Sequence, residues 1–164
     1  MITLQTNDVK MARQLIRAVT ESQGTPTSFL KFIVESLRSS FPNEYKYGIL
    51  VAARTGQVQK LGYLVKLGAT TNDLIRPLLV ASKNGHFDCV KYLLGLKTVV
   101  FSEATIQQAA KHATAFQHVE VLILILGKLD KYAPGYMKFI DELDVYALKR
   151  GFNDVSAVIQ EFGY

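Results

Sequence analysis

The chain has 164 residues, the length of one typical domain, and 49% of them are hydrophobic and 20% charged, which argues against intrinsic disorder. Its 19 basic residues outnumber its 14 acidic residues, and the resulting net charge of +5 favours acidic partners without diagnosing nucleic-acid binding. Cys89 is the single cysteine, so an intrachain disulfide framework and a thiolate metal cluster are excluded.

The pattern of apolar residues over 1–43 predicts a pair of helices. The first helix is indicated by apolar residues at helical spacing, namely Val9, Ala12, Leu15, Ile16 and Val19. Gly24-Thr25-Pro26 then breaks the pattern, with Thr25 placed to cap the second helix and Pro26 to open it. The expected buried stripe of that second helix consists of Phe29, Phe32, Ile33 and Leu37. We expect this hairpin to cover the open end of a stack of helices.

A repeated helix pair organises residues 44–164. Asn84-Gly85 ends one helix, because glycine accepts the left-handed conformation that a helix C-cap requires. The same layout occurs 29 residues earlier, where Leu50, Val51, Ala52, Gly56, Tyr63 and Leu64 match Leu79, Val80, Ala81, Gly85, Tyr92 and Leu93. The helices of these two pairs are expected at roughly 44–54, 57–67, 73–83 and 86–96.

Two further pairs complete the expected array of about four. If the 29-residue step continues, Ala110, Phe116, Val119 and Leu122 take the places of Ala81, Phe87, Val90 and Leu93, with Thr114 in place of the glycine. The fourth pair follows Pro134-Gly135 and ends in a helix that Asn153 or Asp154 caps. No stretch alternates as a strand does, so we predict one all-α domain over residues 1–164, built of stacked helix-turn-helix repeats with an N-terminal helical cap.

Residues 76–94 resemble an ankyrin repeat. Pro77-Leu78 follows the Thr-Pro-Leu-His opening of that family, and its Ala-Ala, Gly-His and Val-Lys-x-Leu-Leu elements are similar to Ala81-Ser82, Gly85-His86 and Val90-Lys91-Tyr92-Leu93-Leu94. The likeness is good over 47–97 and weaker over 104–127 and 143–162. It implies a solenoid of stacked helix pairs that binds other proteins; another class of helix-pair repeat is the alternative.

The chain also departs from the family pattern. The step is 29 residues instead of 33, and the missing residues lie between Gly68-Ala69 and Pro77. The family places a protruding hairpin there, and Thr70-Thr71-Asn72-Asp73 leaves too few residues for one. We therefore expect degenerate repeats with short loops, in which the hairpins are reduced or missing.

No motif predicts catalysis, a metal ion or a cofactor. His112 and His118 are six residues apart, which is not the spacing that places two ligands on one helix face, and His86 occupies the histidine position of the repeat. No nucleophile elbow or phosphate-binding loop is visible. Cys89 is expected to be a small buried residue rather than a reactive thiol. An enzyme whose site is assembled from distant residues is the third hypothesis.

The candidate binding surface is a column of basic residues. Equivalent positions of successive first helices line up along the concave side of a stack, and Arg54 and Lys83 both lie two positions after the small core residue. The 29-residue step adds His112, and the glycine anchor adds Lys149 with Arg150 beside it. Exposed helix ends also tolerate lysine and arginine without any binding role. Further candidate contacts are three tyrosines in or beside loops, Tyr45, Tyr132 and Tyr136.

The function predicted from these features is non-catalytic protein–protein interaction, by an adaptor or an inhibitor that meets an acidic protein surface. A nucleic-acid-binding helical repeat protein is the alternative, and it requires basic residues clustered on one face. Asp8, Lys10 and Arg13 interrupt the N-terminal segment, which has no apolar run of signal-peptide length, and no stretch is long enough to span a membrane. We expect a cytoplasmic location, in the producing cell or in a host; the oligomeric state is not indicated.

Overall fold

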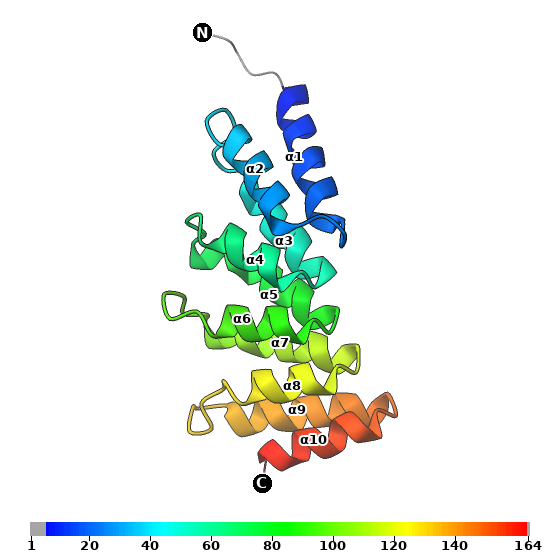
Figure 1. Cartoon of the computed structure of the whole chain (residues 1–164). Coiled ribbons are helices and arrows are strands. Elements are labelled where there is room, and N and C mark those ends of the chain that lie inside the picture. The colour runs from blue at the N-terminus through cyan, green and yellow to red at the C-terminus, as the bar shows by residue number, and fades with distance from the viewer. Residues whose placement is uncertain (1–5, 164) are drawn as a thin grey trace. The chain divides into compact units, whose positions relative to one another are not determined.

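The structure, a computed structural model, describes residues 6–163, and every regular element in this range is a helix (Figure 1). The helices are α1 (Thr6–Glu21), α2 (Thr27–Leu37), α3 (Tyr45–Thr55), α4 (Val58–Val65), α5 (Thr71–Lys83), α6 (Phe87–Leu94), α7 (Glu103–Ala115), α8 (Val119–Leu126), α9 (Tyr136–Lys149) and α10 (Asn153–Gly163). The predicted all-α class and the predicted helix pairs are confirmed. None of these helices is both long enough and apolar enough to cross a membrane.

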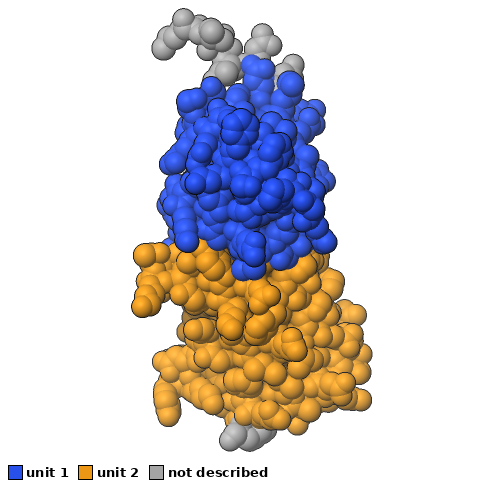
Figure 2. All heavy atoms as spheres, viewed as in Figure 1, with its two compact units in different colours: residues 1–77 blue, residues 78–164 orange. Residues whose placement is uncertain are grey.

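Two compact units make up the chain, residues 1–77 and residues 78–164 (Figure 2). The division falls at Pro77, inside α5. Each unit is built of helix pairs packed in layers. The division of the chain into a cap over 1–43 and one array over 44–164 stays a prediction.

In the first unit, α1 packs on α3 and α2 packs on α4, so the N-terminal hairpin forms a layer of the same kind as the pair that follows it. Ile16, Leu30, Ile49 and Leu64 are fully buried between these helices. A Cβ atom on Gly48 would lie 2.9 Å from Cγ2 of Ile16, so glycine is needed where α3 approaches α1.

The prediction of which face of α2 is buried was wrong. Leu30 and Val34 are buried, whereas the side chains of Phe29 and Phe32 are 47% and 61% exposed. Pro26 is itself the N-cap residue, with extended backbone and no capping side-chain bond, so the helix begins at Thr27. The prediction followed the largest apolar residues, but the residues that face α4 are a smaller pair spaced four apart.

Two side chains, one from α4 and one from the turn before it, donate hydrogen bonds to the C-terminal end of α1. Lys60 is 3% exposed, and its ammonium donates to the carbonyl oxygens of Val19 (2.9 Å) and Ser22 (2.6 Å). The amide of Gln57 donates to the carbonyl oxygen of Glu21 at 3.0 Å. The last carbonyl groups of a helix have no partner within the helix, and these two side chains supply one from the next layer.

The loop between α4 and α5 is residues 66–70, too short for a hairpin, as predicted. Asp73 accepts hydrogen bonds from the backbone N–H (2.9 Å) and the hydroxyl (2.8 Å) of Thr70, which caps the first turn of α5. Lys46 lies 3.1 Å from the same carboxylate. Burial acts to raise the pKa of Asp73, but the hydrogen bonds from Thr70 and the ammonium of Lys46 outweigh it and lower that pKa.

In the second unit, α7 packs on α9, while α8 packs on both α6 and α10 (Figure 1). Leu93, Leu122, Ile125 and Ile159 are fully buried in this unit. Cys89 is buried in α6, as predicted.

The turns between the paired helices from α3 to α10 share one hydrogen bond, which defines the repeat register. The residue after each turn donates its backbone N–H to an alanine carbonyl in the preceding helix: Gln57 to Ala52, His86 to Ala81, His118 to Ala113 and Phe152 to Ala147, at 2.9–3.0 Å. The step from Ala81 to Ala113 is therefore 32 residues instead of 29, and Ala110 is not the equivalent of Ala81. The residue in the left-handed conformation at this turn is Gln117 (φ 58°), so the expected glycine position is not Thr114.

Candidate functional site

The corrected register changes the third member of the predicted basic column. Arg54, Lys83 and Lys149 each lie two residues after the defining alanine, and by that register the third equivalent is Ala115 rather than His112. His112 lies one residue before its defining alanine, as Tyr146 does in α9. In this register the third of the four equivalent positions therefore carries a small side chain.

The predicted basic residues fall into both units. Arg54 belongs to the first unit, where it forms an ion pair with Glu21 at the end of α1. Lys83, Lys149 and Arg150 are exposed in the second unit, and His112 is half-buried there. Lys83 and His112 lie close enough for the ammonium to influence the pKa of the imidazole.

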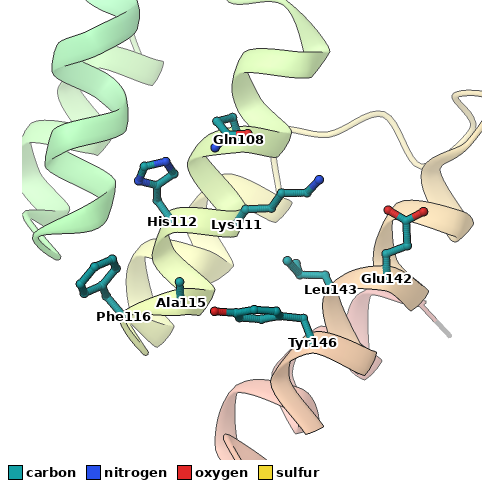
Figure 3. A pocket seen from close by; sticks show the side chains of 8 residues that line it. All are labelled: Gln108, Lys111, His112, Ala115, Phe116, Glu142, Leu143 and Tyr146. Carbon is teal, nitrogen blue, oxygen red and sulfur yellow. The ribbon is translucent and has the colours of Figure 1, made fainter. Parts of the chain in front are cut away.

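A groove in the second unit lies between α7 and α9 (Figure 3). Its volume is about 470 Å³, within the range of ligand-binding clefts. Its lining residues are Gln108, Lys111, His112, Ala115, Phe116, Glu142, Leu143 and Tyr146. Leu143 is buried, whereas the side chains of Phe116 and Tyr146 are 49% and 37% exposed. Figure 3 shows the Tyr146 ring extending from α9 toward Ala115, with Phe116 on the other side of Ala115.

Cationic side chains lie over aromatic rings around this groove. The ammonium of Lys83 is 5.0 Å from the ring centroid of Phe116, and the guanidinium carbon of Arg150 is 5.6 Å from that of Tyr146. The ammonium of Lys111 is 5.8 Å from the ring centroid of Phe139. Such contacts fix the charged groups over apolar surface while they stay accessible to a partner. The groove margin is therefore positively charged and its walls are aromatic.

Glu142 is the carboxylate in the groove lining, and its side chain lies 3.9 Å from the ammonium of Lys138. Burial and the nearby ammonium of Lys83 lower the pKa of His112 below the ordinary value of 6.5, which disfavours the charged imidazole. Nδ1 of His112 is buried and has no hydrogen-bond partner among the described residues.

The other histidines and the cysteine have structural surroundings. Nε2 of His118 donates to the carbonyl oxygen of Lys83 at 2.9 Å, which ties the turn after α7 to the end of α5. His86 is the N-cap residue of α6. Burial raises the pKa of the Cys89 thiol to about 11. Within the described residues, no three His, Cys, Asp or Glu side chains gather as a metal site would require.

Of the groove lining, sequence reasoning predicted only His112; the residues that it missed include Lys111, Phe116 and Tyr146. The 29-residue step placed Phe116 in the second helix of its pair, as the equivalent of Phe87. Of the tyrosines predicted as contacts, Tyr45 and Tyr136 are buried and Tyr132 is 96% exposed. No sequence signal marked the true end of α7, because the left-handed residue at that turn is Gln117 and not glycine.

Residues 73–99 match the family model of the Ankyrin repeat. The match covers α5 from Asp73, all of α6 and the residues up to Val99, and it includes the Pro77-Leu78 and Gly85-His86 elements on which the resemblance rests. The predicted ankyrin repeat is therefore confirmed over this segment. Ankyrin repeats are protein–protein interaction modules and are generally non-enzymatic. Residues 73–99 thus form an ankyrin repeat, and the two helix pairs that form the groove follow this segment.

Proposed function

We propose that the chain binds an acidic protein surface through the α7–α9 face of the second unit, as an adaptor or as an inhibitor that covers its target. The observation that supports this is the charge around the groove. Lys83, Lys111 and Arg150 each lie over an aromatic ring, while Glu142 has a lysine beside it. Exposed aromatic and arginine side chains are the types that most often anchor protein interfaces.

We also propose that this role is non-catalytic and cytoplasmic. The imidazole of His112 has no carboxylate partner in the described residues, and that of His118 is engaged with a backbone carbonyl. General acid–base or nucleophilic catalysis needs such a group beside a partner that activates it. The buried thiol of Cys89 is compatible with a reducing compartment.

Charge reversal tests this proposal. Lys83→Glu combined with Lys111→Glu reverses two charges of the proposed face, and Lys97→Glu combined with Lys128→Glu makes the same change in net charge at exposed positions outside the groove lining. Proteins that the wild-type chain captures from cytosol are quantified for each variant over a range of salt concentrations. We expect the first variant to lose an acidic partner and the control to keep it, because like charges facing each other oppose association.

Equal capture by all three proteins would refute the basic face as a binding surface. The nucleic-acid alternative has its own signature in the same experiment. Capture that disappears after nuclease treatment, with steep salt dependence, would establish that alternative instead.

A further inference from the structure

The groove exists because Ala115 occupies a position where the equivalent helices carry arginine or lysine. Arg54, Lys83 and Lys149 hold long side chains at this place in the register. The side chain of Ala115 ends at Cβ, so the space above it is bounded by Phe116, Tyr146 and Leu143. The basic residues at the other equivalent positions supply cationic groups, and the small side chain of Ala115 leaves an apolar recess in the groove.

We propose that the recess receives a large apolar side chain of the partner, aromatic or long aliphatic, which has a carboxylate beside it in the same segment. This inference rests on the proposed function and specifies its partner. The aromatic rings of Phe116 and Tyr146 and the side chain of Leu143 supply the apolar contact surface. The recess has the volume to hold one such side chain together with atoms of the flanking residues.

The charged groups set the second part of the partner's chemistry. Lys83, Lys111 and Arg150 lie around the recess, and the negative charge of Glu142 is offset by Lys138. An apolar side chain flanked by lysine or arginine would meet like charge at this margin, whereas a flanking carboxylate meets opposite charge. Affinity therefore comes from the buried apolar side chain, and orientation from the carboxylate.

The substitution Ala115→Lys distinguishes binding of an apolar side chain in the recess, called the anchor below, from binding by charge alone. Lysine at this position restores the basic column and adds one positive charge, but its side chain fills the recess. Ala115 is the last residue of α7, where a cation interacts favourably with the helix dipole, so the variant is expected to fold. Ala157→Lys, on an exposed position of α10, adds the same charge elsewhere and is the matched control.

The probe is a displayed library of random short peptides, selected on the full-length chain and counter-selected on Lys83→Glu/Lys111→Glu. Enriched peptides are synthesised and their dissociation constants are measured by fluorescence anisotropy. We expect enrichment of peptides that join a large apolar residue to an acidic one. Ala115→Lys should weaken these peptides by about tenfold or more, the size of burying one apolar side chain, and Ala157→Lys should not. Circular dichroism confirms that each variant is folded.

Two results would overturn the anchor. If the enriched peptides are acidic without an apolar residue, or bind Ala115→Lys as tightly as wild type, the recess is not used, while the acidic-surface function stands. If no peptide depends on Lys83 and Lys111, the proposed function fails and the anchor fails with it.

Discussion

Substitution of Gly85 by alanine tests how the layers of the second unit are joined. Gly85 has φ 72° and Gly151 has φ 74°, so alanine at either position bears the same backbone strain of about 1–2 kcal/mol. A Cβ atom at residue 151 meets nothing within 4 Å, but at residue 85 it would lie 2.5 Å from Nδ1 and 2.7 Å from Cε1 of the His118 ring. The ring must move, and its bond to the Lys83 carbonyl is lost.

The two costs at residue 85 can be added to the strain. Overpacking contributes about 1–3 kcal/mol, and the lost hydrogen bond contributes about 1 kcal/mol. We expect Gly85→Ala to lower the free energy of unfolding by about 3–6 kcal/mol and Gly151→Ala by about 1–2 kcal/mol. Urea unfolding followed by circular dichroism measures both values, provided that the slope m is unchanged.

A double-mutant cycle shows whether His118 is the cause. In a His118→Ala background the ring is absent, so Gly85→Ala should cost only the strain of about 1–2 kcal/mol. Differences in stability between layers cancel in this cycle. If Gly85→Ala keeps its full cost without the ring, the contact between Gly85 and His118 is not what the glycine serves.

Three further predictions concern single positions. Gln117→Gly should raise the free energy of unfolding by about 1 kcal/mol in urea titrations, because it relieves the left-handed conformation of a non-glycine residue (φ 58°); no change would mean that the turn is not strained. Native Cys89 should resist alkylation at slightly alkaline pH and react at the rate of unfolding, since the thiol is buried and its pKa is about 11; prompt labelling, read by mass spectrometry, would contradict its burial. The pKa of His112 is lower in the folded than in the unfolded chain, so its contribution to stability is present above pH 6.5 and is lost as the pH falls through that value toward the folded pKa. His112→Gln should therefore flatten this part of the pH dependence, and an unchanged profile would refute the lowered pKa.

Helix positions were predictable because their signals are local. Gly56, Gly85 and Gly151 end their helices in the left-handed conformation, and the sequence marks each of these turns with glycine. Gly85 also belongs to the Gly-His element of the family resemblance, and the family match covers it.

Register and phase were less predictable, because they depend on packing between segments distant in sequence. The residues between α6 and α7 lengthen the second step, from Ala81 to Ala113, to 32, and Gln117 carries no sequence signal for the turn it makes. In α2, large aromatic residues suggested a core, but Leu30 and Val34 face α4 while Phe29 and Phe32 are exposed. The groove followed from the register, so it could not be predicted before the third turn was placed.

The contacts made by Lys60 and Gln57 have a consequence for shortened versions of the chain. Both side chains leave α4 and its preceding turn to reach carbonyl oxygens at the end of α1. A fragment starting at residue 44 would keep the donors and lose every acceptor, leaving an ammonium group in a surface shaped to enclose it. The first helical hairpin therefore supplies hydrogen-bond acceptors that the next helix pair needs. A minimal version of this protein has to include α1 up to Ser22.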